Sequence, residues 1–157
     1  MRKAWVAAEW LLLIFFLGGL LLAILPFSDM FHFGRDMKDA RNQGIYYPGP
    51  GSAERQAYYG SSLQVDGVVY DGGELRLYMT ATRLGPSNRL PLQVKLRTDG
   101  GALLESSASG STNTAIRSQG YYAFKDVPEG IRSATFFYDS FGESFRFDIP
   151  LQSGGKP

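Results

Sequence analysis

The sequence contains no cysteine, only one histidine and no appreciable excess of charge of either sign. Its 16 basic and 15 acidic side chains give a formal net charge of +1. This balance argues against nucleic-acid binding, which requires a basic patch on the protein surface. The absence of cysteine excludes disulfides, cysteine-ligated metals and a thiol nucleophile. A folded domain of this chain must therefore be stabilised by packing without covalent cross-links.

The motifs of several large enzyme classes are also missing. There is no G-x-S-x-G nucleophile elbow, no phosphate-binding loop and no dinucleotide-binding fingerprint in the sequence. A Ser–His–Asp triad would need His32, which follows closely after the apolar N-terminal segment. We therefore expect no catalytic residue, no cofactor-binding residue and no metal ligand, and we predict that the protein is not an enzyme.

Hydrophobic residues are concentrated at the N-terminus, where 21 of the first 27 residues are apolar. Residues 10–27 carry no charge, and a helix of this length spans about 27 Å, close to the hydrocarbon thickness of a bilayer. Arg2 and Lys3 precede the segment, and basic residues favour the cytoplasmic side. We predict one transmembrane helix acting as an uncleaved signal anchor in the plasma membrane, with the N-terminus in the cytoplasm and the C-terminal domain outside.

Several side chains of this segment are suited to a lipid bilayer, which is the first predicted partner. Tryptophan favours the headgroup boundary, and a carboxylate favours the positive end of a helix dipole. Two small residues four apart can bring two membrane helices together, although glycine is common in membrane helices generally. The candidate anchor residues are Trp5, Glu9, Trp10, Gly19, Ala23 and Pro26. We assign residues 1–27 to a cytoplasmic stub and this helix.

The surroundings of Glu9 resemble the N-terminus of type IV pilins and pseudopilins. Residues 2–4 would form a short basic leader, Trp5 would begin the mature chain, and Glu9 would be its fifth residue. Gly18 and Pro26 fall where many pilins have a glycine and a proline. The resemblance implies that Glu9 pairs with the N-terminal amine of a neighbouring subunit. It therefore implies an alternative function as a pilin-like structural subunit of a secretion or competence pseudopilus.

Residues 28–60 differ in character from the segments on either side. Ser28 could cap a short helix in which Met30, Phe33 and Met37 recur at helical spacing. Residues 44–52 are rich in glycine and proline, a composition typical of irregular linkers. We therefore expect a juxtamembrane stalk or linker over residues 28–60.

Apolar and polar residues alternate in short runs over residues 61–151, and turn sequences separate these runs. The runs cover residues 63–70, 75–82, 90–97, 121–127, 134–138 and 145–151. Residues 105–120 are rich in Ser, Gly, Thr and Asn, so we expect a polar loop with at most a weak strand near Ile116. This pattern predicts an all-β domain, an antiparallel Ig-like β-sandwich of six to seven strands, followed by a disordered tail at 152–157.

Two stretches of the predicted sandwich resemble Ig-like domains of unknown function. Residues 63–83 are similar to the opening strands of such domains, and residues 124–151, with the motifs FKDVPEG and FGESF, fit the closing hairpin. These domains occur outside the membrane in single-pass, anti-sigma-factor-like proteins of Gram-positive bacteria. The resemblance implies an extracytoplasmic domain in the cell envelope. Only about five residues precede the hydrophobic segment, so we do not expect a direct anti-sigma role.

Aromatic side chains that point away from the predicted core are candidates for partner contacts. We select Tyr121, Tyr122, Phe137 and Phe141 as these contacts. The sequence as a whole predicts a non-enzymatic binding or interaction module, or an accessory subunit of an envelope complex, with a protein partner in the membrane or envelope. Two alternatives stay open: a calcium site on turn carboxylates, and a surface for anionic wall polymers on exposed basic residues.

Overall fold

The computed structural model describes residues 9–19, 27–83, 89–114 and 116–151. The chain divides into two compact units, Met1–Gly34 and Arg35–Pro157. In the first unit, residues 9–19 form a helix whose apolar side chains are exposed. None of the described helices combines the length and the apolarity that crossing a membrane requires.

The structure covers only part of the predicted anchor. Glu9, Trp10 and Gly19 belong to the helix of residues 9–19, and both Glu9 and Trp10 are exposed. A β-carbon built on Gly19 would have no atom within 4 Å. Trp5, Ala23 and Pro26 lie outside the described residues, as do residues 20–26 as a whole and the predicted tail.

Helix α2 (Phe27–Asn42) begins in the first unit and ends in the second. It has 16 residues and is therefore longer than the short helix expected to begin at Ser28. Gly44 ends it in the left-handed conformation, with φ of 73°, and the N–H of Ile45 donates to the Ala40 carbonyl at 3.0 Å. The Arg41 guanidinium lies 4.8 Å from the centre of the Tyr46 ring, so the helix end is held against the first strand.

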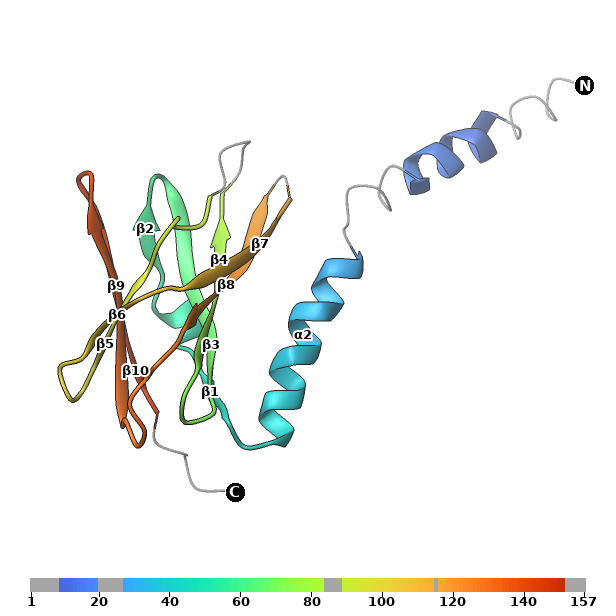
Figure 1. Ribbon diagram of the computed structural model, residues 1–157. Helices are drawn as coiled ribbons and strands as arrows, with labels where there is room; N and C mark the ends of the chain where they lie inside the picture. Colours follow the sequence, from blue (N-terminus) through green and yellow to red (C-terminus); the bar gives the residue numbers. More distant parts are fainter. Residues whose placement is uncertain (1–8, 20–26, 84–88, 115, 152–157) are drawn as a thin grey trace, which may run out of the picture. The chain divides into compact units, whose positions relative to one another are not determined.

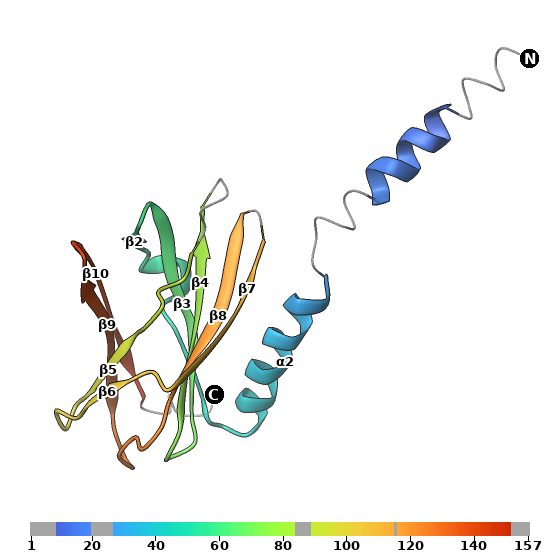
Figure 2. The same cartoon turned by 45° about the horizontal axis from the view of Figure 1, so that its top comes forward.

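The described part of the second unit contains ten strands. They are β1 (Tyr46–Pro48), β2 (Gln56–Tyr58), β3 (Ser61–Tyr70), β4 (Leu75–Thr82), β5 (Lys95–Thr98), β6 (Leu103–Glu105), β7 (Ala108–Asn113), β8 (Arg117–Phe124), β9 (Ser133–Ser140) and β10 (Glu143–Pro150), with a 3-10 turn at Gly51–Ala53. The larger sheet has the order β1-β3-β4-β8-β7, with β2 also paired to β3, and the smaller sheet has the order β10-β9-β5-β6. All pairs are antiparallel. The prediction of a mostly β, two-sheet antiparallel domain is confirmed (Figures 1 and 2).

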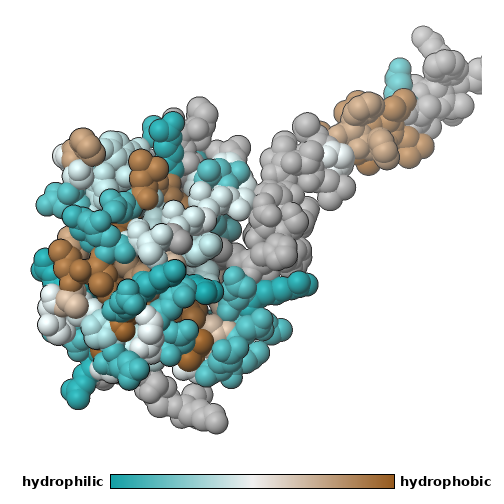
Figure 3. Space-filling view, viewed as in Figure 1, coloured by the Kyte–Doolittle hydropathy of each residue, from teal (hydrophilic) through white to brown (hydrophobic). Residues whose placement is uncertain are grey.

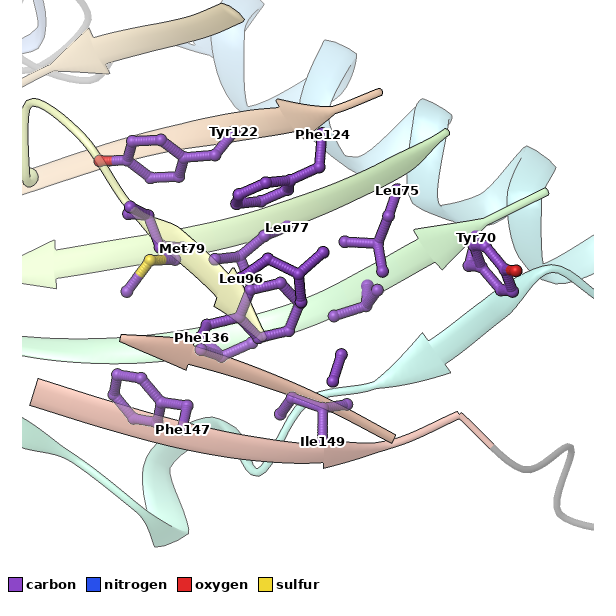
Figure 4. Packing of buried hydrophobic residues seen from close by; sticks show 14 of the residues in the cluster. Tyr70, Leu75, Leu77, Met79, Leu96, Tyr122, Phe124, Phe136, Phe147 and Ile149 are labelled. Atoms are coloured by element: carbon purple, nitrogen blue, oxygen red, sulfur yellow. The ribbon is translucent and has the colours of Figure 1, made fainter. Parts of the chain in front are cut away.

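The core fills the space between the two sheets. Alternate residues of β3, β4 and β8 point inward, and they meet alternate residues of β5, β9 and β10 (Figure 4). The largest fully buried side chains are Phe124, Phe136, Phe147, Leu63, Leu75, Leu77, Met79, Leu96 and Ile149. The alternation in the sequence therefore predicts the core-facing residues of these strands correctly, because one side of each strand lies in the core.

A β-bulge in β3 interrupts the alternation between Val65 and Gly67. The bulge allows Val65 and Val68, three positions apart, to reach the same core. Asp66 is the extra residue, and its carboxylate accepts hydrogen bonds from the Thr80 hydroxyl at 2.6 Å and from the Gln64 amide at 2.8 Å. This network explains why Thr80 is buried on the outer face of the larger sheet.

Three segments differ from the sequence-based expectations. The strand expected over 90–97 is shorter, because only Lys95–Thr98 pairs in a sheet. The prediction of a polar loop over 105–120 is wrong, because β7 and the first half of β8 form there. β7 pairs with β8 over its whole length. The expected stalk at 28–60 contains α2 and the two short strands β1 and β2, which both pair with β3. Polar or very short edge strands carry too little hydrophobic alternation to be seen in the sequence.

Candidate binding groove

A groove opens between the two sheets at one end of the domain. Its lining comes from both sheets and from the segment before β5, and its volume is about 880 Å³. The lining residues are Tyr58, Tyr59, Arg83, Arg89, Leu90, Pro91, Leu92, Ser109, Gly110, Ser111, Asn113, Tyr122, Tyr138 and Phe141. The tips of the β2–β3 and β9–β10 hairpins and the far end of β4 all lie at this end of the domain (Figures 1 and 2). We call this feature the end groove.

The end groove is open because its wall in the larger sheet is built from small residues. Ser109, Ser111 and Asn113 of β7 lie opposite Tyr122, Gly120 and Ser118 of β8, respectively, so these side chains share the inner face. A β-carbon on Gly120 would lie 2.7 Å from Leu90 Cδ1, so Leu90 packs directly on the strand backbone. The chain around Leu90 covers the sheet here in place of a paired strand.

Two aromatic side chains stand at the rim of the end groove, each in an unusual backbone position. Tyr59 and Gly60 form the two-residue turn between β2 and β3, with φ of 44° and 73°. Phe141 and Gly142 form the corresponding turn between β9 and β10, with φ of 54° and 79°. Positive φ at both positions is the type I′ geometry, which favours Asn, Asp or Gly at the first position. Both turns carry an exposed aromatic residue there, and Phe141 is 89% exposed.

The inner wall of the end groove is a cluster of tyrosines. The rings of Tyr58 and Tyr138 lie 5.4 Å apart edge to face, and Phe145 stacks on Tyr138 at 5.8 Å. The hydroxyl of Tyr122 donates to the Pro91 carbonyl. Burial raises the pKa of the Tyr58 and Tyr122 phenols, and Tyr138 raises that of Tyr58 further. Both phenols are therefore neutral at physiological pH.

The charged side chains that line the end groove are both basic, Arg83 and Arg89. Arg83 Nη1 donates to the Tyr59 carbonyl at 3.0 Å, which fixes the guanidinium beside the rim. Neither arginine forms an ion pair with any residue that the structure describes. Burial, Tyr138 and the charge of Glu143 together raise the pKa of Tyr59 at the rim. The lining is therefore positive and aromatic.

The exposed basic residues that the sequence suggests for polymer binding are Arg76, Lys95, Arg97 and Arg146, and the structure gives each of them a partner. Arg76 pairs with Glu74 at 2.6 Å, Arg146 with Asp148 at 3.1 Å and Lys95 with Glu105 at 3.5 Å, and Arg97 lies 5.3 Å from the centre of the Phe137 ring. Three of the four are thus locally neutralised, unlike the two arginines of the end groove. For calcium, the described residues include no group of three or more side chains placed to hold a metal ion.

The structure separates the four predicted contact residues. Tyr122 and Phe141 line the end groove, the first buried and the second exposed. Tyr121 lies on the outer face of the larger sheet, 6.3 Å from Tyr78 between ring centres. Phe137 lies on the outer face of the smaller sheet beneath Arg97. Hydrophobic and hydrophilic patches alternate over the face of the domain shown in Figure 3.

Sequence reasoning missed Tyr59, Arg83 and Arg89 as members of one site. These residues come from separate hairpins and loops, and only the tertiary fold brings them together. One local signal was available: an aromatic residue directly before glycine, in Tyr59-Gly60 and Phe141-Gly142, at a hairpin turn. Comparison of the chain with models of protein families, with curated proteins and with solved structures gives no match.

Proposed function

We propose that the protein is a membrane-anchored, non-enzymatic binding module whose Ig-like domain lies outside the cytoplasm and holds a protein partner in the end groove. The observation that carries the proposal is the pair of aromatic residues, Tyr59 and Phe141, at positions where hairpin geometry favours small polar residues. Residues that conflict with local backbone preference are concentrated at functional sites.

The chemistry of the end groove supports a protein partner. Tyrosine and arginine are the residue types that most often dominate the energy of protein interfaces, and both are present here in an open site. Tyr58 and Tyr122 of the inner wall are buried, so these side chains need little further ordering when a partner binds. The uncharged stretch of residues 10–27, preceded by Arg2 and Lys3, supports the anchor and its orientation.

Site-specific photocross-linking in the cells that produce the protein tests this function. A photoreactive phenylalanine analogue at position 141 should give a defined adduct with one partner protein, because the ring at this position is exposed at the rim. The same analogue at Arg132, which is exposed but not part of the lining, is the matched control. Equal labelling from both positions, or no adduct at 141, would contradict the proposal.

A further inference from the structure

Strand β7 is an unprotected edge of the larger sheet. It has six residues and pairs only with β8, and it contains neither a charged residue nor proline. The other edges that the structure describes are short or blocked. β1, β2 and β6 have three residues each, β1 ends in Pro48, and the β10 backbone at Arg146 is bonded to the Gln56 side chain. Such blocking is how proteins prevent a further strand from adding to a sheet.

The hydrogen-bond pattern shows which backbone groups of β7 face outward. Thr114 N–H donates to the Arg117 carbonyl opposite it, at 2.7 Å. In an antiparallel ladder, hydrogen-bonded pairs alternate with non-bonded pairs. Counting back through the register from Thr114, the residues that bond to β8 are the even-numbered ones. The N–H and C=O groups of Ser109, Ser111 and Asn113 therefore point to the free edge.

The same three residues also line the end groove. Ser109, Ser111 and Asn113 are exposed, and their side chains lie on the inner face of the sheet. A chain laid along β7 would therefore pair with their backbone and direct every second side chain towards the groove. The lining provides aromatic rings and the two arginines for these side chains. The free edge and the groove together form one continuous surface.

We propose that the partner binds as an extended peptide segment that adds a strand to the free edge of β7. Alternate side chains of this segment enter the end groove, and at least one of them is a carboxylate that faces Arg83 or Arg89. This inference rests on the proposed function and defines the form of its partner. Strand addition derives affinity from main-chain hydrogen bonds and specificity from pockets for alternate side chains. An acidic side chain complements a lining that holds two arginines and no carboxylate.

Short fluorescein-labelled peptides can test the proposal on the full chain in detergent micelles. The probe is a positional-scanning set with threonine at alternate positions and every residue type at the others, followed by fluorescence anisotropy. We expect binding to favour peptides with Glu or Asp together with an aromatic residue at the varied positions. Two N-methylated forms of the best peptide, methylated on opposite sets of alternate amides, should differ. One should lose at least about tenfold in affinity and the other should keep it.

Two variants of the protein test the same contact by changing the edge strand in place of the peptide. Ser111→Pro removes an outward N–H without removing a bond to β8, and proline is tolerated at such an edge position. It should weaken binding of the best peptide by about tenfold or more, the scale of one lost hydrogen bond plus a local clash. Ser111→Ala keeps the backbone N–H and changes only the side chain, so it should lose clearly less affinity than Ser111→Pro, and the difference between the two variants isolates the backbone contribution. Circular dichroism would establish that both variants are folded.

The outcomes separate this inference from the proposed function. Equal binding of both N-methylated forms, or no binding from the whole peptide set, would overturn strand addition while leaving the cross-link from position 141 intact. A concentration-dependent dimer that is lost in Ser111→Pro would also overturn it, because the occupant of the edge would then be a second copy. The methylated peptides decide the matter even if Ser111→Pro does not fold.

Discussion

Phe141 occupies a turn position at which stability alone would favour asparagine. Its φ of 54° lies in the left-handed region, which residues with a β-carbon disfavour. Its ring is 89% exposed. For a residue other than glycine or asparagine, this backbone conformation lowers the free energy of unfolding by about 1 kcal/mol. The ring contributes little burial in return. We interpret the position as one where binding has outweighed stability.

Replacing Phe141 should therefore stabilise the domain. We expect Phe141→Asn to raise the free energy of unfolding by about 0.5–1 kcal/mol, because asparagine fits a type I′ turn and little packing is lost. Urea denaturation followed by circular dichroism measures the change. Phe136→Ala, in the centre of the core, is the contrasting variant and should lose about 3–5 kcal/mol. A clear loss of stability in Phe141→Asn would mean that the ring packs on the domain.

Asp71, in the β3–β4 turn, makes a pH-dependent contribution to the stability of the domain. Its Oδ1 accepts from the N–H groups of Glu74 at 2.9 Å and Gly73 at 3.2 Å, and these bonds lower the pKa of the carboxyl. Because the folded pKa lies below the unfolded one, the stabilisation is complete above about pH 4. It is lost as the pH falls through the folded value.

Asp71→Asn keeps an acceptor oxygen but does not titrate, so it isolates this effect. The original chain should be the more stable of the two at pH 7, and the difference should shrink as the pH falls below about 4. Urea midpoints measured at several pH values for both chains provide the comparison. The difference will be small, since the carboxylate is exposed to solvent. A difference that is constant across this range would show that the charge is not the cause.

At the scale of elements, Gln56 is a side chain that joins the two sheets. It belongs to β2 of the larger sheet, and its amide both donates to the Arg146 carbonyl and accepts from the Arg146 N–H at 2.9 Å. β10 is thereby bonded on its outer edge without a neighbouring strand. This contact closes one edge of the smaller sheet and contrasts with the free edge of β7.

We expect Gln56→Ala to lower the free energy of unfolding by about 0.5–1.5 kcal/mol, because two backbone groups of β10 lose their partner. Gln93→Ala is the control, since the Gln93 amide donates to the exposed Glu105 carboxylate at 2.9 Å. That variant should change stability by less than about 0.5 kcal/mol. Thermal denaturation of both variants in parallel makes the comparison. Equal losses would indicate that the bond across the sheets adds nothing.

The elements also show how far the sequence predicts this fold. β4 and β10 alternate apolar and polar residues over eight positions, so their core-facing residues were predictable. The burial of Tyr78 and Thr80 on the outer face of β4 was not predictable from this alternation. β7 was not, because its residues ASGSTN include no large apolar side chain and only the backbone ladder holds it. The segment around Leu92 has the alternation of a strand, but Pro91 cannot donate a ladder bond. Leu92 accordingly remains 94% exposed at the end groove.

The candidate site was only partly predictable for a related reason. Phe141 and Tyr122 were selected as aromatic residues that point away from the predicted core, which is wrong for Tyr122, a buried member of the core cluster. Their common groove depends on the tertiary packing. Arg83 and Arg89 flank a turn sequence and resemble ordinary solvent-exposed charges when read locally. A groove at the end of a sandwich is a property of tertiary packing, which neither periodicity nor turn chemistry encodes.

At the scale of the whole molecule, the proposed function requires that the apolar N-terminal segment holds the chain in a membrane. Leu13 lies in the helix of residues 9–19 and is 59% exposed there. Arginine at the centre of a membrane helix costs about 2.5–3.5 kcal/mol during insertion. Leu13→Arg should therefore reduce the fraction of the protein that resists alkaline extraction from membranes. Leu92→Arg, at an exposed position of the domain, should leave that fraction unchanged.

The N-terminal mass of the membrane-bound protein then separates the two anchored functions. An uncleaved signal anchor should keep the residues before Trp5, with Met1 or Arg2 at its start. A chain beginning at Trp5 would instead favour the pilin-like subunit, in which Glu9 is the fifth residue. Recovery of the original chain outside the membrane fraction would contradict both. Because the cross-link at position 141 reports on the end groove independently, failure of the anchor would leave the binding proposal testable by itself.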